Sequence, residues 1–132
     1  MIIALVDDLM FGSKIRAAAD RANAGVTFVR SRDALLPELL AARPSLVILD
    51  LDRDALDPIG AIRAIRGDSR VRSTRLVAFV RHTSAEAIAR AREAGVDQVL
   101  ARSAFFPALA GMLAGVAPAS SGAGGSNEPG GA

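Results

Sequence analysis

The sequence contains no cysteine, so neither a disulfide framework nor a thiolate metal site can form, and this absence fits a reducing compartment. The opening apolar residues run directly into two aspartates and have no basic leader. We therefore expect neither a signal peptide nor a membrane span, and a cytoplasmic location. The formal net charge is only +2, which gives no reason to expect nucleic acid as a partner.

Hydrophobic residues make up 51% of the 132 residues, which suits one compact domain with a substantial buried core. The final stretch, residues 117–132, is rich in glycine, serine and proline and has too few apolar side chains to bury. We predict a folded domain over residues 1–116, followed by a disordered tail over residues 117–132.

The most informative stretch is the apolar run at residues 46–49, which ends at Asp50. The run is too short for a helix of its own and is typical of a strand buried on both faces. Because burying an unpaired carboxylate is costly, we expect Asp50 to lie at the carboxyl end of this strand, facing a crevice.

Four further apolar runs predict strands, and helical spacing or a capping signal follows each of the five. The predicted strands are residues 2–6, 26–29, 46–49, 76–80 and 96–101. The helix signals are spacing from about Phe11, a cap at Ser31 or Asp33, Asp57 before Pro58, a capping box from Thr83 to Glu86, and apolar spacing from Phe105.

Strict alternation of strands and helices predicts an α/β fold, a single doubly wound five-stranded parallel sheet with helices on both faces. The simplest strand order is 2-1-3-4-5, which makes the first and third strands neighbours. Their carboxyl ends would bring Asp7 and Asp8 close to Asp50. Such carboxylates repel one another unless a cation neutralises them, and Mg²⁺ suits this donor set. The alternative is that these aspartates only cap helices.

The chain over about residues 2–113 resembles the receiver domain of bacterial two-component response regulators. The matching pieces are Asp7 and Asp8 after the first strand, residues 44–51 where the family has its phosphoacceptor strand, Asp57 before the third helix, and residues 94–97 at the turn into the fifth strand.

The resemblance implies the flavodoxin-like receiver fold, with Asp50 accepting a phosphoryl group as a carboxylate nucleophile. It implies Mg²⁺ held by Asp7, Asp8, Asp50 and the backbone carbonyl of Asp52. A sensor histidine kinase or phosphotransfer protein would supply the phosphoryl group, and a downstream protein partner would respond. No output domain follows in the sequence, so we expect a stand-alone, non-enzymatic signalling module of a phosphorelay.

The chain departs from the family at positions that serve in switching. The threonine or serine that ends the fourth strand falls on Val80, and the aromatic switch residue falls on Val99. The family's lysine falls on Arg102, and Ser103 replaces the proline that follows it. A guanidinium differs from an ammonium in shape and donor geometry, so Arg102 can either bind phosphate or pair permanently with Asp50.

His82 follows the fourth strand and is a candidate phosphoryl ligand, with a solvent-exposed loop histidine as the alternative. The altered Val80, Val99 and Arg102 favour a second function, a phosphorylation-independent pseudo-receiver that binds proteins. A remote third is a haloacid-dehalogenase-like phosphatase using Asp50 and Asp52, although the residues that follow do not match that motif.

Overall fold

The computed structural model of the protein describes residues 1–81 and 84–116, so the predicted tail at 117–132 and the candidate His82 lie outside the described residues. Within these described ranges, five strands and five α-helices alternate, with one short 3₁₀ helix, η1, before the third helix. In order they are β1 (Ile2–Leu5), α1 (Leu9–Arg21), β2 (Val26–Val29), α2 (Arg32–Ala42), β3 (Leu46–Asp50), η1 (Asp54–Leu56), α3 (Pro58–Arg66), β4 (Leu76–Val80), α4 (Ala85–Ala94), β5 (Gln98–Ala101) and α5 (Arg102–Val116).

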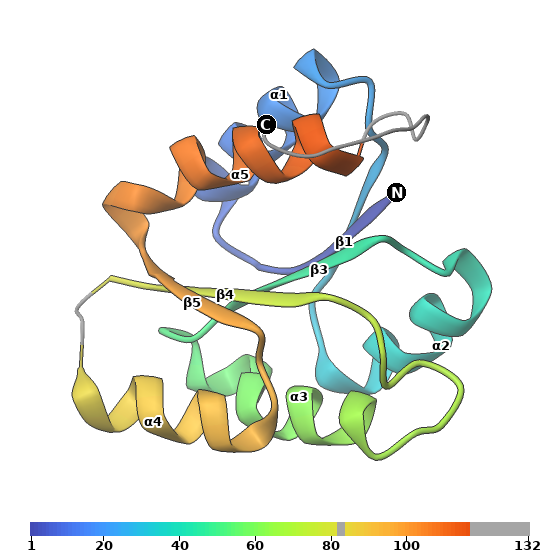
Figure 1. Ribbon diagram of the computed structural model, residues 1–132, viewed down its shortest axis with the longest axis vertical. Coiled ribbons are helices and arrows are strands. Elements are labelled where there is room, and N and C mark those ends of the chain that lie inside the picture. Colours follow the sequence, from blue (N-terminus) through green and yellow to red (C-terminus); the bar gives the residue numbers. More distant parts are fainter. Residues whose placement is uncertain (82–83, 117–132) are drawn as a thin grey trace.

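The sheet is entirely parallel, and its order β2-β1-β3-β4-β5 confirms the predicted topology. Helices α1 and α5 cover one face and α2, α3 and α4 cover the other (Figure 1). Leu5 of β1 lies opposite Leu49 of β3, and Asp50 lies opposite Phe79 of β4. The carboxyl ends of β1 and β3 therefore meet in the middle of one sheet edge.

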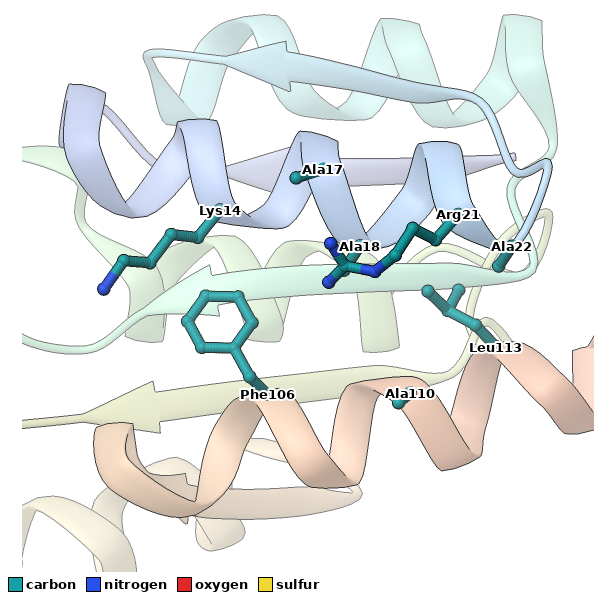
Figure 2. A pocket seen from close by; sticks show the side chains of 8 residues that line it. All are labelled: Lys14, Ala17, Ala18, Arg21, Ala22, Phe106, Ala110 and Leu113. Carbon is teal, nitrogen blue, oxygen red and sulfur yellow. The ribbon is translucent and has the colours of Figure 1, made fainter.

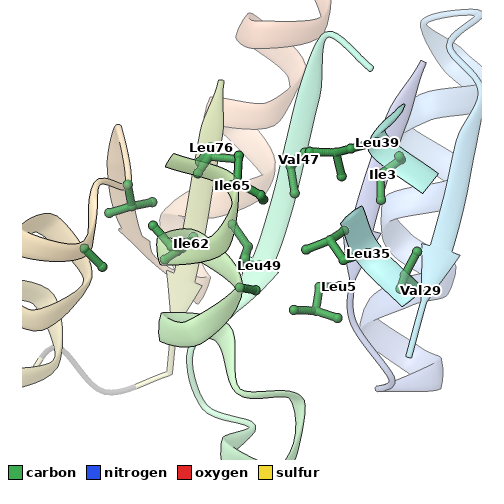
Figure 3. Close-up of a cluster of buried hydrophobic side chains, with 14 of the residues drawn as sticks. Ile3, Leu5, Val29, Leu35, Leu39, Val47, Leu49, Ile62, Ile65 and Leu76 are labelled. Atoms are coloured by element: carbon green, nitrogen blue, oxygen red, sulfur yellow. The ribbon is translucent and has the colours of Figure 1, made fainter. Parts of the chain in front are cut away.

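Alternating strand residues pack into two separate hydrophobic cores, one on each face of the sheet. Ile3, Leu5, Val47 and Leu49 point toward α2, α3 and α4, where they pack with Leu35 and other apolar side chains of those helices (Figure 3). On the opposite face the intervening strand residues pack against α1 and α5, and this second cluster contains Phe11, Phe79 and Phe105. Strands buried on both faces explain the continuous apolar runs in the sequence.

Helix caps account for two of the differences from the predicted boundaries. Helix α1 begins at Leu9, before the predicted Phe11, because the Asp8 side chain accepts a hydrogen bond from the Phe11 amide at 3.0 Å. Helix α4 is capped by Ser84, which accepts from the Ala87 amide at 3.3 Å. The cap is therefore Ser84 and not the predicted Thr83, which lies outside the described residues.

The fifth strand is shorter than predicted and the fifth helix longer. The Val96 amide donates to the Ala91 carbonyl, which completes the C-terminus of α4 around Gly95 (φ 118°) and leaves Val96 outside the strand. Strand β5 starts at Gln98, and α5 begins directly after it at Arg102, before the predicted Phe105.

A side chain at position 60 of α3, in place of Gly60, is predicted to destabilise the protein. Asp57 caps this helix in a left-handed conformation (φ 48°), accepts from the Gly60 amide at 3.1 Å, and pairs with Arg32 at 2.8 Å. A Cβ on Gly60 would overlap the Asp57 carboxylate. Gly60→Ala should therefore cost about 1–2 kcal/mol, the usual size of a lost cap, measured by urea unfolding.

Gly111 of α5 provides the matched control, because among the described residues a Cβ there would meet no atom within 4 Å beyond the backbone of its own helix. Gly111→Ala should stabilise the protein by about 0.5–1 kcal/mol through helix propensity alone. Equal effects of the two substitutions would contradict the role assigned to the Asp57 cap.

Candidate functional site

Four aspartates gather where β1 and β3 end. Asp50 is the last residue of β3, Asp7 and Asp8 follow β1, and Asp52 follows β3. The Asp50 side chain is completely buried, and its Oδ1 accepts a hydrogen bond from the Asp52 amide at 2.9 Å. The expectation that Asp50 ends its strand is correct. Other side chains cover Asp50 and shield it from solvent.

The covering group is Arg102, whose guanidinium lies among three of these carboxylates. Its Nη2 is 3.3 Å from Asp50 Oδ2, its Nη1 is 3.4 Å from Asp8 Oδ2, and its Nε is 3.5 Å from Asp52 Oδ2. The guanidinium carbon also lies 4.5 Å from the centre of the Phe11 ring and 5.1 Å from that of Phe79. Charge and aromatic stacking together hold this side chain over Asp50.

Two further arginines contact the aspartates, and the sequence analysis did not identify either. Arg53 binds Asp7 through two hydrogen bonds, with Nε to Oδ1 at 2.9 Å and Nη2 to Oδ2 at 2.8 Å. The backbone amide of Arg81 donates to the Asp52 carboxylate at 2.7 Å. Both residues lie in loops after strands, where hydrophobic periodicity carries no information on side-chain direction.

The carboxylates differ in their acidity for identifiable reasons. The hydrogen bonds from Arg53 lower the pKa of Asp7, and the Phe11 amide, together with Arg102, lowers the pKa of Asp8. Burial raises the pKa of Asp50, although the Asp52 amide and the charge of Arg102 oppose that effect. The predicted nucleophile is therefore more basic than an ordinary aspartate.

The donor set has the chemistry that Mg²⁺ prefers, since carboxylate oxygens are hard ligands. Asp7, Asp8 and Asp50 are the residues that would hold the ion. In the part of the chain that the structure describes, however, no three histidine, cysteine, aspartate or glutamate side chains are arranged to bind one ion together. Arg53 and Arg102 are paired with these carboxylates instead.

Val80 and Val99, the predicted switch positions, lie in the adjacent strands β4 and β5. Val80 is buried at the end of β4, and Val99 is half-buried in β5. Neither side chain has a hydroxyl or any other hydrogen-bond donor. The neighbouring candidate, His82, is outside the described residues, so its role stays a prediction.

A separate cavity of about 570 Å³ lies between α1 and α5 (Figure 2). Its walls are largely apolar, and Lys14 and Arg21 of α1 flank it. The lining residues are Lys14, Ala17, Ala18, Arg21, Ala22, Phe106, Ala110 and Leu113. None of them is acidic or nucleophilic at neutral pH, so this groove is not the site of the predicted phosphoryl chemistry.

No protein-family model and no curated protein matches the sequence. Solved structures do match. A response regulator from Hahella chejuensis has a TM-score of 0.78 at 18% identity, covering 92% of this chain and 98% of that one. The response regulator RPA3017, in red light signaling of R. palustris, has a TM-score of 0.74 at 21% identity, covering 91% and 95%.

A third match is the receiver domain of sensor histidine kinase PA1611 from Pseudomonas aeruginosa, described with a magnesium ion coordinated in its active site cleft. Its TM-score is 0.75 at 20% identity, covering 85% of this chain and 92% of that one. No helix in the described ranges is long and apolar enough to cross a membrane. The chain has the flavodoxin-like fold of response regulator receiver domains.

Proposed function

We propose that this chain is a cytoplasmic signalling module of the two-component type, in which Asp50 accepts a phosphoryl group. The observation that carries the proposal is the position of Asp50, a carboxylate of raised pKa at the end of the central strand β3 with a guanidinium directly over it. A sensor histidine kinase or phosphotransfer protein would be the donor, and a downstream protein would read the result by direct contact. We do not propose nucleic acid or membrane as a partner.

Asp50 Oδ2 is the oxygen suited to attack, because Oδ1 is held by the Asp52 amide. In the transfer, Oδ2 forms a bond to phosphorus while the bond from phosphorus to the donor's leaving group breaks and its electron pair leaves with that group. Mg²⁺, when bound, would neutralise charge on the transferring group. The guanidinium of Arg102 lies beside Oδ2 and is placed to pair with phosphoryl oxygens.

Switching after transfer would differ from that of the family, because Val80 and Val99 cannot donate a hydrogen bond to a phosphoryl oxygen. Arg102 is then the side chain that responds to the new charge on Asp50. It also stacks on Phe11 of α1, so its response would extend to the packing between α1 and α5.

A second candidate function is a phosphorylation-independent protein-binding module. The observation in its favour is that Arg102 already contacts Asp50, Asp8 and Asp52, so the acidic residues are partly neutralised without any ligand. In that case the residues of the crevice would only stabilise the fold, and a partner protein would bind to the surface of the domain.

Thermal melting with Mg²⁺, with and without beryllofluoride, separates the two candidates. Beryllofluoride mimics an aspartyl phosphate, and a ligand that binds the native state must raise its melting temperature. We expect an upward shift that requires both Mg²⁺ and beryllofluoride in the wild type. Asp50→Asn, which keeps the side-chain shape, should abolish the shift.

A shift that persists in Asp50→Asn would show that another residue binds the anion, and the assignment of Asp50 would fail. A folded wild-type protein that shows no shift at saturating concentrations would favour the phosphorylation-independent module.

A further inference from the structure

We propose that the guanidinium of Arg102 is the resident counter-ion of the acidic crevice, and that a divalent cation reaches Asp8 and Asp50 only after this guanidinium has left them. The inference deepens the proposed function, and rests on it in assuming that the crevice admits a divalent cation. It concerns what this chain's own arginine does to metal binding.

The first argument is the length of the contacts. The ion pairs Arg53–Asp7, Arg66–Asp97 and Arg70–Asp68 have their closest nitrogen and oxygen at 2.7–2.8 Å, as charge-assisted hydrogen bonds do. The contacts of Arg102 with its three carboxylates are 3.3–3.5 Å long. Arg102 thus shares its charge among several acids without making a short bond to any of them.

The second argument is an unused donor. Among the residues that the structure describes, the buried Nε of Arg102 has no hydrogen-bond partner, and the side chain as a whole is 20% exposed. An unsatisfied buried donor lowers the stability of the folded state. The guanidinium is therefore held by the local charge and by the Phe11 and Phe79 rings, in a position that leaves part of its hydrogen-bonding capacity unused.

The third argument is the balance of charge. Four carboxylates, those of Asp7, Asp8, Asp50 and Asp52, contact two guanidiniums, those of Arg53 and Arg102. The six groups carry a formal charge of −2 together, so the two arginines that contact the four carboxylates do not balance their charge. Since the side chain of Arg102 is partly exposed, it has a path toward solvent when a cation takes over its role.

The competition follows from geometry. Mg²⁺ holds its oxygen ligands at about 2.0–2.1 Å. A carboxylate oxygen that already contacts the guanidinium of Arg102 would have to give up that contact to bind the ion so closely. Binding to the wild type must therefore include the free energy of moving Arg102 away. The observed affinity is the intrinsic affinity multiplied by the fraction of molecules in which the guanidinium is already displaced.

The experiment is a titration of the full-length protein with MgCl₂ by isothermal titration calorimetry, without any phosphate analogue. Arg102→Met removes the charge and keeps an apolar chain against Phe11 and Phe79, and it should bind Mg²⁺ at least about 10-fold more tightly than the wild type. Arg70→Ala, which removes an exposed arginine paired with Asp68 outside the crevice, is the matched control and should leave the affinity unchanged.

Melting temperatures provide a second readout and cover the case of a poorly folded variant. In EDTA, Arg102→Met and Arg102→Ala should both melt lower than the wild type, because the carboxylates lose a neutralising charge. Excess Mg²⁺ should recover most of that loss and shift the wild type less. A loss that Mg²⁺ does not recover in either variant would indicate a purely structural arginine and overturn the proposal.

The outcomes also separate this inference from the proposed function. Equal Mg²⁺ affinity in the wild type and Arg102→Met would overturn the competition, even if beryllofluoride still shifts the wild type. Tighter Mg²⁺ binding in Arg102→Met without any beryllofluoride response would support the competition and overturn phosphoryl acceptance by Asp50.

Discussion

Phe79→Ala should lower the free energy of unfolding by about 3–5 kcal/mol, the usual cost of removing a buried aromatic ring. Phe79 is fully buried near the carboxyl end of β4. Its ring centre lies 4.2 Å from that of Phe11 and 5.1 Å from that of Phe105, and Arg102 stacks against it as well. The variant thus loses apolar burial, aromatic contacts and one of the two rings that stack against the guanidinium of Arg102.

The measurement is urea unfolding followed by circular dichroism, because the chain contains no tryptophan or tyrosine to report by fluorescence. Phe79→Leu is the control that keeps a large apolar side chain, and it should cost clearly less than Phe79→Ala. Phe106→Ala, at a half-buried ring of the same cluster, should fall between the two. A cost below about 1 kcal/mol for Phe79→Ala would contradict a tightly packed aromatic cluster on this face.

Asp50→Asn should stabilise the metal-free protein at neutral pH, although it removes the proposed nucleophile. Burial raises the pKa of Asp50 in the folded state, so ionisation of this carboxyl costs more in the folded chain than in the unfolded chain, where the ordinary value is 3.8. The wild type therefore loses stability relative to the variant as pH rises from that value through the folded pKa. Asparagine can still accept the Asp52 amide hydrogen bond.

The check is the difference in melting temperature between the two proteins in EDTA, at pH 7 and again near pH 3. We expect the variant to melt several degrees higher at pH 7, as about 1 kcal/mol shifts a domain of this size by roughly 2–8 °C. Near pH 3 both side chains are mostly neutral and the difference should nearly vanish. A variant that melts lower at pH 7 would mean that the pairing of Asp50 with Arg102 outweighs the cost of burying the charge.

The fold was predictable because its determinants are local and repeated. The apolar runs at residues 26–29 and 76–80 are strands with the predicted bounds, and Asp57 before Pro58 caps the third helix as expected. The boundaries that were wrong depend on groups without a periodic signal. The Asp8 cap lengthened α1, and the turn at Gly95 removed Val96 from β5.

The residues that form the site were easier to predict than the contacts between them. Parallel strands bring their carboxyl ends to one edge, so Asp7, Asp8 and Asp50 follow from the topology alone. The partners of the carboxylates do not, because Arg53 lies in an irregular loop. The alternatives weighed for Arg102 both placed it at this edge, and only side-chain packing determines that it covers Asp50.

Strand β5 ends at Ala101 and α5 begins at Arg102, with no residue between them. The side chain that covers Asp50 therefore belongs to the first turn of the helix that also carries Phe106. Both lie against the Phe11 ring, Arg102 at 4.5 Å and Phe106 at 4.9 Å, and Phe106 lines the groove between α1 and α5. A displacement of Arg102 would leave one face of that ring free, so we expect a change at the buried aspartate to reach the packing of Phe106 at the edge of the groove.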